Sequence, residues 1–512
     1  MRKGMLGSIA ALAAGAGTAW AQAPMPAPPA GGPPVVKTVG AQEPFGVPGT
    51  GGLDGPGGPS PVIMPPLGVG PQGDPHGIGP VGGFGPPPGP MYPTPGPYAQ
   101  PLWQPGGPGG AGQDVPGIGA PRFWMRSEFL LWVPKAMPSA YPLLTTSAPS
   151  DAGLLGRPST LVLAGGEEFS YDMSPGARFT FGFFGDADRR FGFETTGFFM
   201  SQRHNESTFV TSPTGIPVLA RPFIDSLGRP VSSLVVGTPN FASGAATVDA
   251  STLSYSVEAS GVWNLFRSAP GNPVQMSLDF LMGYRYFELR EELRVESQST
   301  LNVPDTITPL FVVGPNGTLT QVGTQITQVP TLFGGTQIFN PSTVTVVDSI
   351  RATNRFNGGQ VGIRGEVRYG MFTFAGTGKL GLGHMHQTLQ FDGNSGYTNA
   401  ASGRAGGAFG GLLVNASNIG KYNNDEFAVM PEFIGNLGIN VTKSVNVYLG
   451  YNFLYTNKVV RPGAQVNPVV NTAQVPFSTN YGALGRPNVS RVLFDQDDFW
   501  LMGINFGLQI RF

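Results

Sequence analysis

The 512-residue sequence contains no cysteine and only four histidines, His76, His204, His384 and His386. The absence of cysteine excludes disulfide bonds, thiolate metal sites and thiol nucleophiles, and it is compatible with export through an oxidising compartment. The sequence also lacks the G-x-S-x-G, H-E-x-x-H and phosphate-loop patterns. Because these patterns carry serine-nucleophile, zinc-hydrolase and nucleotide chemistry, we expect no enzymatic activity, no catalytic residue and no cofactor.

Charged residues are also scarce, at 12% of the chain, which is about half of their share in an average soluble protein. The 30 lysines and arginines nearly balance the 31 aspartates and glutamates, and no basic block occurs. A nucleic-acid partner is therefore not expected.

The sequence has no apolar run long enough for a membrane-spanning helix, which needs about 18 residues. An apolar run from Met5 to Trp20 follows Arg2, and Ala19 and Ala21 flank Trp20 in the order of a cleavage site. This pattern predicts a signal peptide over residues 1–21, cleaved after Ala21, because the run is too short for an N-terminal membrane anchor. If the mature chain lies in a membrane, it must cross as β-strands.

Proline and glycine dominate the next segment, with 54 of the 98 residues from Ala23 to Ala120. Such a composition cannot build a hydrophobic core, so residues 22–120 are predicted to form an extended, disordered linker. The linker could be a periplasmic tether that contacts cell-wall polymer or a passive spacer.

The last 15 residues predict a β-strand with one apolar side. Every second residue from Trp500 to Phe512 is apolar, and the residues between Met502 and Phe512 are glycine or polar. This pattern is typical of the closing strand of an outer-membrane β-barrel, although an edge strand of a soluble sandwich would show the same period. In a barrel, its apolar residues would be the signal for the assembly machinery: Ile504, Phe506, Leu508, Ile510 and Phe512.

Ten such two-residue patterns follow one another from Pro121 onward. They cover about residues 123–133, 176–185, 190–200, 253–266, 276–295, 358–369, 371–387, 426–441, 444–455 and 498–512. Long connections, at about 134–173, 202–248, 298–347, 392–422 and 459–494, alternate with connections of a few residues. An all-β, up-and-down antiparallel transmembrane barrel of about ten strands, or alternatively twelve, over residues 121–512 explains this alternation, because both termini and all short turns then share the periplasmic side.

Charged residues of both signs lie on the polar side of these strands, which in a barrel faces the lumen. They are Arg126, Glu128, Arg178, Glu194, Glu258, Asp279, Arg285, Arg364, Glu366, Arg368, Glu432 and Arg511. A ten-stranded barrel is only slightly wider than the eight-stranded kind that side chains fill. These residues could therefore line a narrow passage for small polar solutes, or pair across the lumen and close it.

Three weaker patterns have ordinary structural explanations. His384 and His386 share one side of a strand, as a metal pair would, but this position is expected at the outer membrane interface. Asp495, Asp497 and Asp498 could bind calcium, but carboxylates at a strand start are usually just solvated, so no metal site is predicted. The aromatic residues near strand ends are expected to form interfacial girdles: Trp124, Trp132, Trp263, Trp500, Tyr284, Tyr286, Tyr451 and Tyr455.

Several longer sequence motifs resemble those of a known family, the β-barrel porins of planctomycetes called beta-barrel porin seven, over about residues 123–512. They are LARPF at 219–223, LMGYRYFELREEL at 281–293, NRFNGGQVGIRGE at 354–366, GGLLVNASNIGKY at 410–422, FAVMPE at 427–432, GYNFLYTNKVVRPG at 450–463 and FWLMGINFG at 499–507. The resemblance implies an outer-membrane location and a porin-like role in the cell envelope. The alternative role is a structural or adhesive surface barrel with a closed lumen, whose outer loops contact partners or surface-layer components, while cell-wall components are candidate partners of the linker.

Overall fold

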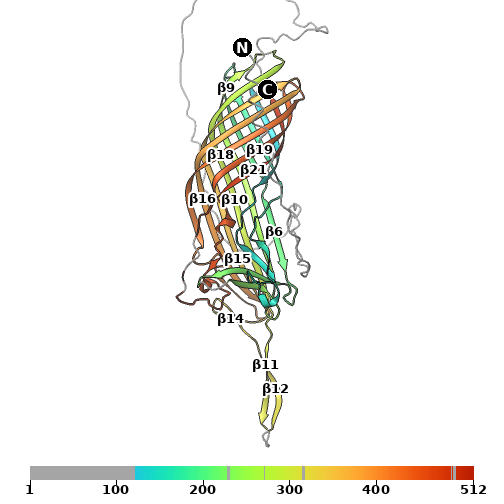
Figure 1. Ribbon diagram of the computed structural model, residues 1–512, viewed down its shortest axis with the longest axis vertical. Coiled ribbons are helices and arrows are strands. Elements are labelled where there is room, and N and C mark those ends of the chain that lie inside the picture. The colour runs from blue at the N-terminus through green and yellow to red at the C-terminus, as the bar shows by residue number, and fades with distance from the viewer. Residues whose placement is uncertain (1–121, 228–230, 270, 314–317, 486, 488–491) are drawn as a thin grey trace, which may run out of the picture. The chain divides into compact units, whose positions relative to one another are not determined.

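A computed structural model describes residues 122–227, 231–269, 271–313, 318–485, 487 and 492–512. Ten antiparallel strands form one closed ring, in which β1 pairs with β21 and β9 with β10 (Figure 1). In chain order they are β1 (Phe123–Pro134), β4 (Ser174–Phe184), β5 (Phe191–Met200), β9 (Ala242–Arg267), β10 (Val274–Leu301), β15 (Ser342–Tyr369), β16 (Phe372–Asn399), β18 (Gly420–Asn440), β19 (Val445–Val460) and β21 (Gln496–Arg511). The predicted ten-stranded barrel is confirmed. The predicted signal peptide, with Ala19 and Ala21, and the linker at 22–120 lie outside the described residues.

The first and last residues of the barrel domain meet at the rim that carries the short turns. The amide of Phe123 donates to the carbonyl of Phe512 at 2.8 Å, and the amide of Phe512 donates back at 3.0 Å. Their rings stack with centroids 6.0 Å apart. Since these contacts join the first and last strands, the terminal residue takes part in closing the barrel.

The side-chain pattern of β10 marks where the membrane ends. Its outward residues are apolar from Met276 to Tyr284 and become charged from Glu288 onward. The inward residues change in the opposite sense, from the buried Arg285 to the buried Phe287. The apolar outer band from Met276 to Tyr286 has the length of a transmembrane strand, about 9–11 residues. Beyond it the barrel wall is polar outside and apolar inside, as in a water-soluble protein.

This reversal explains why the predicted strands are too short and the predicted loops too long. β9 has 26 residues, and β10, β15 and β16 have 28 each. Beyond the membrane their outward positions carry Arg351, Arg355 and Asp392 instead of apolar residues. A search for apolar residues on the lipid side therefore ends at the membrane surface, although the strand continues.

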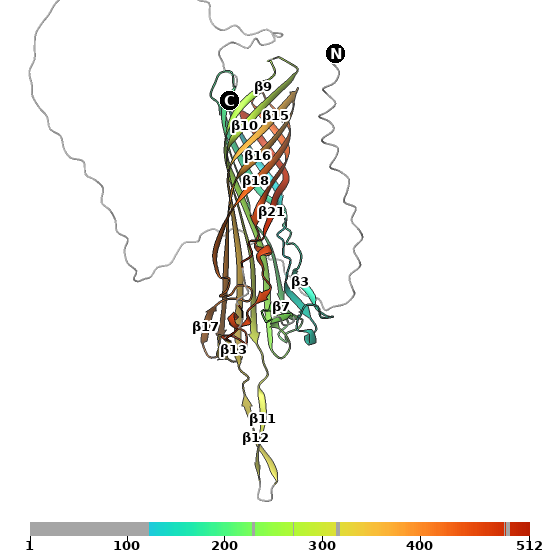
Figure 2. The same ribbon diagram turned by 60° about the vertical axis from the view of Figure 1, so that its left-hand side comes forward.

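The long connections build a head at the outer end of the barrel (Figure 2). Two strands extend the barrel sheet, β6 (Arg203–Val210) and β17 (Arg404–Phe409). A second sheet contains β2 (Pro142–Ser147), β3 (Leu161–Gly165), β7 (Val218–Asp225), β8 (Ser232–Gly237) and β20 (Val469–Val470). The remaining elements are the hairpins β11 (Thr306–Val313) with β12 (Leu319–Thr327) and β13 (Thr331–Phe333) with β14 (Thr336–Ile338), and the short helices η1 (Pro149–Asp151), η2 (Pro462–Gln465) and η3 (Thr472–Gln474). None of the described helices is long and apolar enough to cross a membrane.

Apolar residues of these connections pack against the inner wall of the outer barrel half. Leu143, Leu412 and Val470 belong to one buried cluster with Leu293 and Val346 of the barrel strands. A buried ion pair between Arg221 of β7 and Asp348 of β15 joins the head sheet to the wall. The outer half of the barrel is therefore filled by its own connecting segments.

Candidate functional site: the barrel interior

The twelve charged residues predicted for the lumen all lie on the inward register of their strands. Eight of them are buried: Glu128, Arg178, Glu194, Glu258, Asp279, Arg285, Arg364 and Glu432. Arg126, Glu366, Arg368 and Arg511 are half-buried toward the short-turn end. The structure thus separates the twelve residues into a buried central layer and a more open group near the chain termini.

Glu432 on β18 is the centre of the buried layer. Arg285 donates to one of its oxygens, and Arg178 and Lys379 lie 3.7 and 3.9 Å from its carboxylate. Glu258 completes this part from the opposite wall, since Lys379 Nζ lies 2.6 Å and Arg285 Nη2 3.2 Å from its oxygens. Cations from β4, β10 and β16 therefore meet carboxylates of β9 and β18 across the bore.

Two further carboxylates of the layer have partners from other strands of the wall. Glu128 binds Arg178 and also accepts a hydrogen bond from the Tyr448 hydroxyl at 2.6 Å. Glu194 accepts from Arg364 at 2.7 Å and from the Trp124 indole at 3.0 Å. Because buried charges are costly without partners, this pairing stabilises a filled lumen. The cavity within the layer is only about 30 Å³, which is room for about one water molecule.

An apolar layer lies on the outer side of the charged layer. It consists of buried side chains from eight strands of the wall: Leu130, Trp132, Phe198, Met200, Phe287, Leu289, Phe356, Met385, Ala428, Met430, Leu454, Val459, Phe499 and Leu501. Ring contacts connect Trp132 to Phe198 at 5.2 Å, and Phe198 to Phe287 and Phe287 to Phe499 at 6.5 Å. The layer therefore extends across the bore.

The connection after β19 covers the apolar layer. Arg461 and Glu291 form a two-pronged ion pair with distances of 2.6 and 2.9 Å, and both side chains are fully buried. Arg461 also donates to the carbonyl of Ala136 at 2.6 Å, and its guanidinium lies over the Phe499 ring at 5.5 Å. The segment is thus fixed to β10, to the connection after β1 and to β21.

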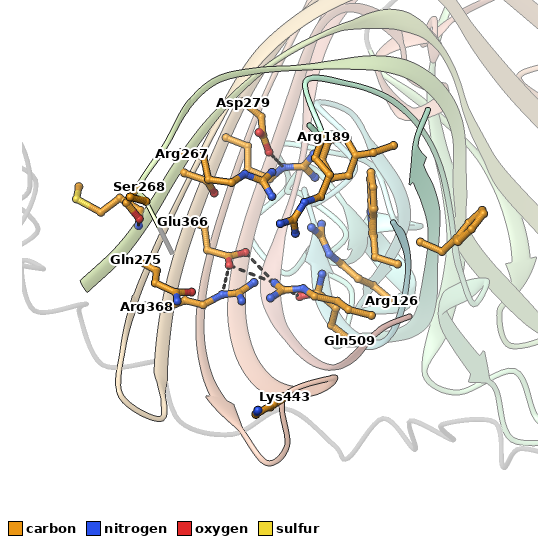
Figure 3. A pocket seen from close by; sticks show the side chains of 18 residues that line it. Arg126, Arg189, Arg267, Ser268, Gln275, Asp279, Glu366, Arg368, Lys443 and Gln509 are labelled. Carbon is orange, nitrogen blue, oxygen red and sulfur yellow. Dashed lines mark hydrogen bonds and ion pairs between the residues drawn. The ribbon is translucent and has the colours of Figure 1, made fainter. Parts of the chain in front are cut away.

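A chamber of about 370 Å³ occupies the short-turn end of the interior (Figure 3). Six of the predicted lumen residues line it, namely Arg126, Asp279, Arg364, Glu366, Arg368 and Arg511. Three further cations line it from turns or strand ends: Arg189, Arg267 and Lys443. The chamber is therefore strongly cationic, whereas positive and negative charges balance in the adjacent buried layer.

Strand periodicity could have identified Lys379, which the sequence prediction missed. It lies on β16 in register with the inward Thr373 and Thr377, between the outward residues Gly378 and Leu380. Arg189 and Lys443 gave no such signal, because a turn has no two-residue register. Their place in the chamber follows only from the closed barrel.

Two of the aromatic residues predicted for the interfacial girdles are not there. Trp124 and Trp132 are buried inside the barrel, on the register of Arg126 and Glu128. Trp124 hydrogen-bonds to Glu194, and Trp132 packs in the apolar layer. Trp263, by contrast, is exposed on the outer wall. The prediction was wrong for Trp124 and Trp132 because it considered only that they lie near a strand end. It ignored which side of the strand each residue faces.

The residues of the weaker patterns lie on the outer wall or at strand ends. His384 and His386 are in contact with Asp425 on β18, at 3.2 and 2.6 Å. Asp497 and Asp498 pair with Lys135. Among the described residues, no group of three or more His, Asp or Glu side chains is arranged to hold a metal ion.

The terminal strand has the orientation expected of an assembly signal. Ile504, Phe506, Leu508, Ile510 and Phe512 are all exposed on the outer wall. They lie between the outward faces of β1 and β19, the two strands that flank β21. An apolar strip of this kind contacts lipid in a membrane barrel.

Comparison with known families decides the classification of this barrel. Residues 124–338 and 324–512 match the family described as "Putative beta barrel porin-7 (BBP7)". The chain belongs to this family. The resemblance inferred from the sequence is thereby confirmed, and the matched residues of this porin-7 chain include every strand of the barrel apart from the first residue of β1. Family membership and the apolar outer band together identify an outer-membrane β-barrel.

Among solved structures, the porin-7 chain is similar to the crystal structure of the outer membrane protease OmpT from Escherichia coli. The similarity has 10% sequence identity and a TM-score of 0.32, and it covers 76% of this chain and 97% of that chain. No curated protein matches the chain.

Proposed function

We propose that this porin-7 barrel is closed to solute diffusion and serves as a non-catalytic anchor that displays its head at the cell surface. The observation that carries the proposal is the stacking of two buried layers across the bore, one of paired charges and one of apolar side chains. An ion that enters the apolar layer would lose its hydration without gaining a partner, which is strongly unfavourable. This arrangement favours the structural and adhesive role over passive diffusion of small polar solutes.

The hairpin β11–β12 supports a role of the head in contacts outside the barrel. Figures 1 and 2 show the hairpin extending away from the rest of the head. Its apolar side chains are largely exposed, with Val313 at 66% and Leu319 at 67%. Exposed apolar groups of this kind mark contact surfaces. A surface-layer component is the partner that we propose for the head, cell-wall polymer is that of the periplasmic linker, and lipid and the assembly machinery are those of the barrel.

A liposome-swelling assay tests the closed lumen against the diffusion alternative. Vesicles that contain the folded chain should swell in small sugars no faster than vesicles without protein. A swelling rate that rises with the amount of protein and falls with the size of the sugar would instead establish passive diffusion. Surface contact is tested separately, because replacement of the hairpin β11–β12 alone should weaken surface-layer attachment without changing the swelling rate.

A further inference from the structure

The cationic chamber at the short-turn end has no role in a closed anchor, but the residues that line it indicate a binding site. Seven of its lining side chains are cations and two are carboxylates. Only 30 lysines and arginines occur in the whole chain. Nearly a quarter of them therefore converge on one cavity of about 370 Å³, which has the size of a small-molecule site.

The two carboxylates of the chamber are already engaged. Asp279 faces Arg364 at 3.3 Å and accepts a hydrogen bond from the Asn264 amide at 2.7 Å. Glu366 binds Arg368 and, at 3.0 Å, Arg511. They offset part of the positive charge, but neither is directed at the remaining cations.

Four cations of the chamber have no ion-pair partner among the described residues: Arg126, Arg189, Arg267 and Lys443. In Figure 3 the side chains of Arg126, Arg189 and Arg267 approach one another on one side of the cavity. Burial, together with the charges of Arg267 and Arg368, lowers the pKa of Arg189. Like charges held together in a concave site attract anions.

The shape of the lining favours oxyanions. Guanidinium groups donate two parallel hydrogen bonds to carboxylate or phosphate oxygens, which gives both strength and orientation. Arg267 is held in place because its guanidinium lies over the Phe184 ring at 5.3 Å. Arg189 has a backbone φ of 54° in the turn between β4 and β5, so the turn itself directs the side chain.

We propose that the chamber binds a small oxyanion with two or more negative charges, of the phosphate or polycarboxylate class, from the periplasmic side. The adjacent buried layer of ion pairs closes the inner side of the chamber. The anion is therefore bound and not transported through the barrel. This inference does not depend on the closed-anchor function, because its readout is binding and not conductance.

Isothermal titration calorimetry of the full chain in detergent tests the chamber, with pyrophosphate and citrate as probes and glucose as the uncharged reference. Saturable binding of at least one anion is expected at low ionic strength, with a large loss in about 0.5 M salt, where exposed charges are screened. The tighter probe identifies the phosphate or the carboxylate class. Absence of saturable binding for both anions would overturn the proposal.

Two double variants assign the binding to the chamber. Arg126→Gln with Arg189→Asn should weaken binding about ten-fold or more, since each removes a charge-assisted contact. Because Arg126 lies beside the buried Glu194, a second variant changes only the turns, Arg189→Asn with Lys443→Gln. Asparagine tolerates the positive φ at position 189.

The matched control is Arg404→Gln, because Arg404 is exposed on β17 in the head and forms no ion pair with any residue that the structure describes. It should bind the probes like the unaltered chain. Unchanged binding in both double variants, with the folded barrel verified by its heat-dependent gel mobility, would contradict the assignment. An equal loss in Arg404→Gln would contradict it as well.

Discussion

At the scale of single residues, Glu432 joins the walls of the barrel. Arg178, Arg285 and Lys379 all face its carboxylate, and all four side chains are buried or nearly so. Removing one partner of a buried ion pair leaves an uncompensated charge, which costs about 3–5 kcal/mol. We therefore predict that Glu432→Gln lowers the free energy of unfolding in urea by about this amount.

Glu296→Gln is the matched control for this prediction. Glu296 pairs with Arg294 at 2.7 Å on the outer surface of β10 beyond the membrane, with side chains 41% and 43% exposed. Exposed pairs contribute at most about 1 kcal/mol. Equal effects of the two substitutions would show that the charges in the lumen are hydrated and do not close it.

At the scale of elements, the hairpin β11–β12 is separable from the barrel. Within the described part of the chain its two strands pair with each other and with no third strand, and their apolar side chains face solvent. We predict that replacing residues 306–327 by a short glycine-serine linker changes the free energy of unfolding by less than about 0.5 kcal/mol, as for surface changes in general.

A substitution in β7 provides the contrast within the head. Arg221 is buried and paired with Asp348 of the barrel wall, so Arg221→Ala should cost about 3–5 kcal/mol. If the hairpin replacement destabilised the barrel as strongly, the hairpin would be part of the folded core. The surface-contact role proposed for it would then lose its basis.

The terminal strand allows a prediction about assembly. Deletion of Phe512 removes the two backbone hydrogen bonds and the ring stack with Phe123 that close the barrel. It also shortens the apolar strip that we expect the assembly machinery to bind. The amount of heat-modifiable protein in the outer membrane should therefore fall sharply.

Phe409→Ala tests whether this effect is specific. Phe409 is 92% exposed in the head and takes no part in closing the barrel, so membrane insertion of this variant should remain normal. Normal insertion of the chain without Phe512 would contradict the role assigned to the last strand.

The elements also show how far the sequence alone could lead. The two-residue period identified all ten strands within the membrane, because lipid requires an apolar outer side there. It could not extend β15 before Gly358, because beyond the membrane the outward positions of this strand carry the charged Arg351 and Arg355. It placed Arg126 and Glu432 in the lumen from register, but whether such charges pair or line a pore depends on contacts between distant strands, as between Arg285 and Glu432.

At the scale of the whole barrel, three layers follow one another along the bore. A cationic chamber lies at the chain termini, a balanced layer of ion pairs follows, and an apolar layer covered by Arg461 lies beyond it. Ten strands leave a bore that side chains can fill. The architecture therefore supports an anchor with a blind pocket on one side and a head on the other.

Single-channel conductance of the refolded chain in a planar bilayer tests the closed lumen most directly. We predict no discrete current steps at moderate voltage. We also predict steps for the variant Phe287→Ala, Phe356→Ala and Glu432→Ala, in which both layers are weakened and which serves as the positive control. Stable, discrete steps with weak ion selectivity in the unaltered chain would contradict the closed lumen and make the mixed charges the lining of an open passage.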